Sequence, residues 1–199
     1  MLKLGITGGI GSGKTTVCQF FEILGVPVYY SDQRAKDLMH SDEVLMAQIR
    51  QAFGRDIYSE DGILNRKALA AVVFADPGKL AALNGMVHPA VFRDFDRWAA
   101  ARKEVPYVLK EAAILFESGS YRDCDYTILV KAPRELRIRR VVGRDGITEE
   151  EVVRRMDAQM SDEDKEARAD FVVLNDEAQL LIPQVLLLHE RLLQESRKR

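Results

Sequence analysis

The chain has few of the residues that would place it among disulfide-bonded, zinc-binding or membrane proteins. Its two cysteines, Cys18 and Cys124, lie far apart and form no C-x-x-C motif, so we expect reduced thiols rather than a disulfide framework. The three histidines show no zinc-site spacing with them. No apolar run reaches membrane-spanning length, and the short N-terminal apolar stretch is broken by glycine, unlike a signal peptide. We therefore expect a cytoplasmic protein with no membrane partner.

Neither sign of charge is in excess. There are 29 Lys and Arg residues against 31 Asp and Glu residues, and the formal net charge is −2, which gives no reason to expect nucleic acid as a partner. The 47% of hydrophobic residues and 30% of charged residues are typical of a globular protein. A length of 199 residues suits one compact domain, or a core with small insertions. We expect a monomer, with a weak oligomer as the alternative.

Glycine, by contrast, is dense near the start of the chain. The stretch GITGGIGSGKTT contains G-x-x-x-x-G-K-[ST] from Gly8 onward, the pattern of a phosphate-binding loop. Glycine lets the backbone approach a ligand closely, so successive N–H groups can converge on phosphate oxygens. The motif predicts that Lys14 reaches the β- and γ-phosphates and that the Thr15 hydroxyl ligates Mg²⁺. The residues predicted to bind nucleotide phosphates are Gly8, Gly9, Gly11, Ser12, Gly13, Lys14, Thr15 and Thr16.

The pattern around this loop is the one that the motif requires. A strand-like run over 2–6 precedes it, and apolar residues at helical spacing follow it as far as Gly25. Further strand-like runs alternate with helical patterns, which favours an α/β fold with a five-stranded, mainly parallel sheet and helices on both faces. These runs cover 26–30, 107–109, 126–130 and 171–174.

Residues 31–104 have helical patterns and no convincing strand. The residues expected to cap these helices are Ser31, Asp42, Asn65 and Asp76. Pro89 should kink or restart the long helix that begins at Pro77. An ordinary crossover needs far fewer residues, so we interpret this interval as an inserted acceptor-binding region.

Two arginine-rich helices joined by a Gly-flanked turn could form a mobile lid. The first covers about 134–142, and Thr148 and Glu151 have the spacing of a capping box for the second. A closing amphipathic helix is expected over 178–195, interrupted early by Pro183. The whole pattern predicts a P-loop three-layer α/β domain with a core of about 1–31, 104–133 and 165–199, a helical acceptor-binding region of about 32–103 and a lid of about 134–164.

In open α/β sheets ligands bind beyond the carboxyl ends of the strands, and three acids follow strand ends. Asp32 could accept the proton of an acceptor hydroxyl or bind Mg²⁺; the alternative is a first-turn acid favoured by the helix dipole. Glu111 stands where a metal-supporting acid is expected, and could equally be an ordinary loop carboxylate. Glu117 is a further candidate for holding substrate.

Arginines gather in PRELRIRRVVGRD, where Arg137, Arg140 and Arg144 share a helix face. They could neutralise developing negative charge on phosphate, or form a solvated basic stripe. Arg155 and Gln159 also share a face, at a spacing that alone indicates little. For His88, a lone histidine in a helical region, a structural role and a catalytic role both stay open.

Phosphate loops also serve GTPase switches, but the chain contains neither D-x-x-G nor N-K-x-D. A small core with a helical insertion and an arginine-rich lid favours a small-molecule kinase. With these pieces in place the chain closely resembles the dephospho-coenzyme A kinases, nearly end to end. The motifs that carry the resemblance are TGGIGSGKTT, YYSDQRAKDL, LNGMVHP, ILFESG, RVVGRDGIT with Arg155 and Gln159 beyond it, and ADFVVLND.

The resemblance implies transfer of the γ-phosphoryl group of ATP, with Mg²⁺, to the ribose 3′-hydroxyl of dephospho-CoA, on a fold like that of nucleoside monophosphate kinases. The alternative acceptor is another small molecule such as a nucleoside or nucleotide. By motif, residues 11–16 would hold the ATP phosphates and Asn175 would lie near the adenine. Catalytic roles fall to Lys14, Asp32 as the base, and the lid arginines Arg140 and Arg144. Substrate-binding roles fall to Asp32, His88, Glu111 and Glu117.

Two positions depart from the family pattern. The family often has Asp-x-Pro-Leu-Leu-Phe-Glu before the lid, whereas this chain begins that stretch with Glu111 and has no proline in it. After the second strand, the common Asp-Ala-Asp is replaced by Tyr30, Ser31 and Asp32, so only the final acid is kept.

Overall fold

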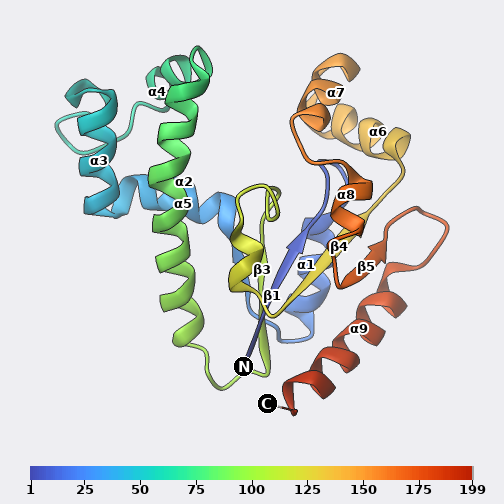
Figure 1. Ribbon diagram of the computed structural model, residues 1–199. Helices are drawn as coiled ribbons and strands as arrows, with labels where there is room; N and C mark the ends of the chain where they lie inside the picture. Colours follow the sequence, from blue (N-terminus) through green and yellow to red (C-terminus); the bar gives the residue numbers. More distant parts are fainter. Residues whose placement is uncertain (199) are drawn as a thin grey trace. The chain divides into compact units, whose positions relative to one another are not determined.

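The structure is a computed structural model that describes residues 1–198 (Figure 1). It contains two compact units, and each is described here by itself. The first consists of Met1–Tyr30 together with the chain from Ala99 onward, and the second consists of Ser31–Trp98.

The first unit is built on a parallel sheet of five strands in the order β2-β3-β1-β4-β5. This confirms the predicted α/β fold, and three of the strands extend further at their carboxyl ends than the sequence predicted. Because the strands are parallel, all of their carboxyl ends meet at one edge, which is the ligand-binding edge of such sheets. The strands are β1 (Leu2–Thr7), β2 (Val28–Tyr30), β3 (Tyr107–Glu111), β4 (Tyr126–Lys131) and β5 (Phe171–Leu174).

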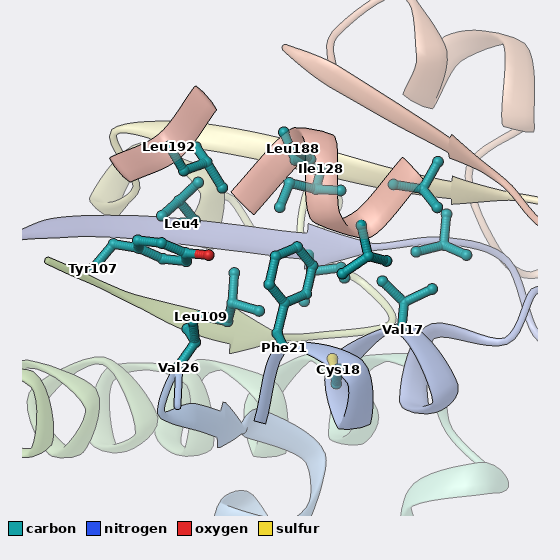
Figure 2. Close-up of a cluster of buried hydrophobic side chains, with 14 of the residues drawn as sticks. Leu4, Val17, Cys18, Phe21, Val26, Tyr107, Leu109, Ile128, Leu188 and Leu192 are labelled. Atoms are coloured by element: carbon teal, nitrogen blue, oxygen red, sulfur yellow. The ribbon is translucent and has the colours of Figure 1, made fainter. Parts of the chain in front are cut away.

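One face of this sheet is covered by α1 (Lys14–Ile23) and α9 (Leu181–Ser196). Figure 2 shows Phe21 of α1 and Leu188 of α9 against the strands, all buried from solvent. Each such side chain contributes about 1.5–3 kcal/mol to folding. On the opposite face Gly5 of β1 touches Leu115, and a Cβ at Gly5 would come within 2.6 Å of it. Because α1 packs against the strands, its start, and with it the glycine loop, is fixed to the sheet.

The remaining helices of the first unit follow the sheet strands. They are α6 (Arg134–Asp145), α7 (Glu149–Asp157), α8 (Asp162–Glu166) and the short η2 (Ser120–Asp123). The predicted capping box is present, with Thr148 accepting from the Glu151 N–H and the Glu151 side chain accepting from the Thr148 N–H. An apolar cluster of Val141, Val152 and Met156 joins α6 to α7.

The second unit is helical, as predicted, with one isolated antiparallel bridge between Tyr58 and Leu64. Three predicted caps are confirmed, because Asp42, Asn65 and Asp76 accept hydrogen bonds from the first-turn N–H groups of their helices. The elements of this unit are α2 (Ser31–Ser41), α3 (Glu43–Phe53), η1 (Arg55–Ile57), α4 (Arg66–Phe74) and α5 (Pro77–Ala100), whose last two residues belong to the first unit.

Three local predictions were wrong. Ser31 is the first residue of α2 itself, and its buried hydroxyl has no hydrogen-bond partner within residues 1–198. The predicted restart at Pro89 does not occur, because α5 is continuous from Pro77 to Ala100, with buried Val87 and Val91 on either side of Pro89. A kink at Pro89 stays a prediction. The last helix begins at Leu181, so Pro183 lies in its first turn, where it interrupts nothing.

Within residues 1–198, no helix is both long and apolar enough to cross a bilayer. In the same range both cysteines are free thiols, as the sequence predicted.

Candidate functional site

The glycine loop joins the end of β1 to the start of α1. Gly11 and Gly13 have left-handed φ angles of 79° and 90°, a conformation that other residues rarely adopt. Gly13 is the N-cap of α1, and no acid occurs in the first turn that follows it, Lys-Thr-Thr-Val. The positive end of the helix is therefore not neutralised by its own side chains and is available to an anion.

Neighbouring groups leave no room for a side chain at three of the loop glycines. A Cβ at Gly8 would collide with the carbonyl oxygen of Val130, and a Cβ at Gly9 would collide with the Arg137 guanidinium. A Cβ at Gly13 would collide with the side-chain amide of Asn175. The glycines thus permit close packing around the loop as well as its backbone conformation.

The polar side chains of the loop differ in their contacts and burial. The Lys14 ammonium donates to the Gly8 carbonyl at 2.9 Å, so it is folded back along the loop. The Ser12 hydroxyl is buried and has no hydrogen-bond partner in the described part of the chain. Thr15 and Thr16 are exposed in the first turn of α1. A buried hydroxyl without a partner is costly, which is consistent with a site completed by a bound ligand.

Asn175, predicted to lie near the adenine, and Arg140, predicted to be catalytic, both contact this loop from outside. The Asn175 amide donates to the Ser12 carbonyl at 2.8 Å. Arg140 reaches the Asn175 side-chain oxygen at 3.3 Å and the Gly11 carbonyl at 3.5 Å, and it pairs with Glu177 at 3.1 Å. The sheet order places β5, and with it Asn175, two strands from β1.

The other two arginines of the α6 face point to different partners. The Arg137 side chain is 9% exposed and pairs with Asp162 at 3.2 Å, against Gly9 of the loop. The Arg144 side chain is 64% exposed, and its Nε lies 2.7 Å from Asp145. This hydrogen bond raises the pKa of Arg144 and lowers the pKa of Asp145. The structure therefore brings Arg137 and Arg140 to the loop, and pairs Arg144 with its neighbour.

The candidate acids of the first unit occupy two environments. Glu111 is buried at the carboxyl end of β3, in register with Ile6 of β1 and Tyr30 of β2, and so lies at the ligand-binding edge. Glu117 accepts a hydrogen bond from the Met160 N–H at 2.9 Å and lies 3.3 Å from the ammonium of buried Lys165. The structure thus gives Glu117 an internal partner that sequence reasoning missed.

The two candidates of the second unit lie on its helices. Asp32 is exposed in the first turn of α2, two residues after β2 ends. His88 is half-buried on α5, with its ring stacked near Phe92 at a centroid distance of 6.4 Å. Burial lowers the pKa of His88. A role for either residue in the reaction stays a prediction.

The sequence analysis named Gln159 beyond the lid motif but assigned it no role. Its side-chain oxygen accepts a hydrogen bond from the Ile10 N–H of the glycine loop at 2.9 Å. The i, i+4 spacing with Arg155 carried no such information, since the partner lies 149 residues away.

Comparison with known proteins finds relatives that match nearly the whole chain. A family model described as dephospho-CoA kinase matches residues 2–180. The dephospho-CoA kinase of Salinibacter ruber is 46% identical over 178 residues, which are 88% of this chain and 89% of the relative. That of Bacteroides fragilis is 41% identical over 185 residues, covering 93% of this chain and 90% of the relative.

A crystal structure of a Thermus thermophilus protein superposes on this fold with a TM-score of 0.81 at 37% identity, covering 98% of this chain and 97% of that one. The match of sequence over nearly the whole chain, together with the glycine loop at the start of α1, shows that the chain belongs to the dephospho-CoA kinase family.

Proposed function

We propose that this chain transfers the γ-phosphoryl group of ATP to the ribose 3′-hydroxyl of dephospho-CoA, giving coenzyme A and ADP. The observation that carries the proposal is the glycine loop, which leads directly into the N-terminus of α1, a helix with no acid in its first turn. Family membership supplies the acceptor. We further propose that the protein acts as a monomer in the cytoplasm.

The loop residues 11–16 would hold the phosphates of ATP through their backbone N–H groups. Lys14 would leave the Gly8 carbonyl for the β- and γ-phosphates, and Arg140, beside Gly11, would neutralise charge that develops during transfer. Asn175 would then lie beside the nucleotide. Arg144 would join them only by exchanging its Asp145 partner for phosphate.

The residues present also fit Mg²⁺. This ion prefers oxygen ligands and is commonly held by one or two protein groups plus substrate phosphates. The Thr15 hydroxyl is exposed at the start of α1, and the Glu111 carboxylate lies at the end of the neighbouring β3. Within residues 1–198 no cluster of three or more His, Cys, Asp or Glu residues could hold a metal unaided. When bound, Mg²⁺ would neutralise charge on the β- and γ-phosphate oxygens.

On the acceptor side we propose that Asp32 accepts the proton of the 3′-hydroxyl as it attacks the γ-phosphorus. His88 would belong to the helical acceptor-binding unit, where it is half-buried on α5. Glu111 and Glu117 would support the acceptor and metal from the sheet unit.

A coupled assay of ADP release tests this function with ATP and Mg²⁺ held constant. The acceptors are dephospho-CoA, coenzyme A (whose 3′-position is blocked), nucleosides and nucleoside monophosphates. We expect ADP release that depends on dephospho-CoA and a product heavier by one phosphoryl group, with no turnover of coenzyme A. Faster turnover of a nucleoside or nucleotide would assign the chain to another acceptor.

A further inference from the structure

Ile10 belongs to the phosphate loop, yet it is attached to the helices that follow β4. Its side chain packs against the apolar cluster of Val141, Val152 and Met156 on α6 and α7. Its N–H donates to the side-chain oxygen of Gln159, just after α7, at 2.9 Å. Both the side chain and the backbone of one loop residue are therefore held by the α6–α7 region.

The chemistry of this hydrogen bond fixes how the Gln159 amide is turned. A backbone N–H can only donate, so the carboxamide must present its oxygen. Within the loop, the one backbone bond across this turn runs from the Ser12 N–H to the Gly9 carbonyl at 3.1 Å, and it does not involve the Ile10 N–H. The conformation at Ile10 therefore depends on a side chain far away in sequence.

Gln159 lies in a chain segment whose neighbouring residues are each anchored by their own contacts. The preceding Met156 is buried in the apolar cluster, and the following Met160 donates its N–H to Glu117 at 2.9 Å. Asp162, two residues further, pairs with Arg137 against Gly9. The carboxamide oxygen is thus presented to the loop from a fixed backbone.

A second carboxamide holds the loop on the other side of Gly11. Asn175 donates to the Ser12 carbonyl at 2.8 Å, so residues 10 and 12 are each bonded to an outside side chain. Gly11 between them has a left-handed φ of 79°. Glycine loses more conformational freedom on ordering than other residues, and a loop ordered in advance spares the ligand that cost.

We propose that Gln159 is a positioning residue for the donor nucleotide: it holds the Ile10 N–H so that ATP meets a phosphate loop already in its binding conformation. The identity of that nucleotide rests on the proposed function. Gln159 acts through the loop and not by touching substrate. Its loss therefore weakens nucleotide binding more than it slows the chemical step.

Two variants at this position and one matched control test the proposal. Gln159→Leu removes the acceptor oxygen, whereas Gln159→Glu keeps an oxygen that can accept from Ile10. Ser161→Ala removes a different acceptor on the same segment, the hydroxyl that caps α8 by accepting from the Asp164 N–H at 3.0 Å, and it leaves the loop untouched. All three are compared by calorimetric Kd for ATP without acceptor, by hydrogen exchange of the Ile10 amide in NMR spectra, and by KM and kcat.

We expect Gln159→Leu to raise the Kd and KM for ATP about 3- to 10-fold, the range of one hydrogen bond, with kcat changed less. Exchange at Ile10 should accelerate in Gln159→Leu and stay near the wild-type rate in Gln159→Glu and Ser161→Ala. An unchanged Kd in Gln159→Leu, or an equal loss in Ser161→Ala, would overturn the proposal. Since binding and exchange need no acceptor, failure of wild-type protein to phosphorylate dephospho-CoA would refute only the proposed function.

Discussion

The ammonium group of Lys165 is fully buried, 3.3 Å from the carboxylate of Glu117. Lys165 lies in α8 and Glu117 in the segment after β3, so the pair ties the chain that follows α7 to the sheet unit. Glu117 also accepts the Met160 N–H. A buried cation requires a compensating charge, and Glu117 supplies it here.

Replacing Glu117 with Gln should therefore destabilise the protein. Gln keeps an oxygen for the Met160 N–H but removes the negative charge beside Lys165. Leaving this buried ammonium without a compensating charge should cost up to about 3 kcal/mol, less where solvent reaches the exposed Glu117 side of the pair. Urea unfolding should show this loss, and the double variant Glu117→Gln/Lys165→Met should recover part of it. If Glu117 chiefly holds substrate, the single variant would instead raise KM for dephospho-CoA at unchanged stability.

Lys14→Ala should abolish phosphoryl transfer while leaving the fold intact. The ammonium bonds to the Gly8 carbonyl, and this half-buried contact contributes little to stability. When the ammonium faces the phosphates, its charge is needed in the transition state. Circular dichroism and thermal unfolding would report an intact fold, and the ADP assay would report lost turnover. Turnover at the wild-type rate would exclude the phosphate loop as the site of reaction.

If Asp32 is the general base, Asp32→Asn should lower kcat at least about 100-fold, because an amide cannot accept the proton of the hydroxyl. The matched control is Asp37→Asn, a change of the same size and charge further along α2. A change confined to KM would make Asp32 a binding residue instead. Equal losses in both variants would attribute the effect to α2 as a whole.

The parts of the fold that the sequence predicted are those whose signals are local. The strands of the sheet, the loop from Gly8 onward and the caps at Asp42 and Asn65 depend on residues a few positions apart. The predicted restart at Pro89 was wrong: proline disfavours a helix interior, but the residues beside it are buried by tertiary packing, and the helix continues.

The site was predicted less completely, since its supports are long-range. No periodicity links Gln159 to Ile10, which lie 149 residues apart, or Glu117 to Lys165. Both contacts form only when folding brings distant strands and helices together. The three arginines of one α6 face were found by their spacing, but only the structure distinguishes loop-bound Arg140 from Arg144, which is paired with Asp145.

The different contacts of Arg140 and Arg144 predict different effects when each is replaced. Arg140→Ala should raise KM for ATP about tenfold, because it removes contacts to the Gly11 carbonyl and Asn175 beside the loop, and it should also lower kcat, because it removes charge that would act during transfer. Arg144→Ala should lower kcat with a smaller change in KM, if Arg144 leaves Asp145 to neutralise transition-state charge. Steady-state kinetics on both variants decides this, and an unchanged kcat in Arg144→Ala would indicate a solvated arginine.

The stability of the fold should fall as the pH drops below about 6.5, in part through His189. Its Nδ1 lies 2.6 Å from the Tyr107 hydroxyl. Burial raises the pKa of Tyr107, so this hydroxyl stays protonated and donates, and a neutral His189 accepts. Burial also lowers the pKa of His189 from its usual value of 6.5, although the charge of Glu190 opposes the shift.

Because the folded pKa of His189 is the lower one, the unfolded chain takes up more protons below pH 6.5 and is favoured there. Denaturant unfolding from pH 7.5 to 5.5 should show proton uptake of up to about one per molecule through this residue. His189→Gln keeps an acceptor for Tyr107 but does not titrate, so its stability should depend less on pH. Tyr107→Phe, which removes only the hydrogen bond, should already be less stable at pH 7.5. A pH dependence in His189→Gln as steep as that of the wild type would contradict this assignment.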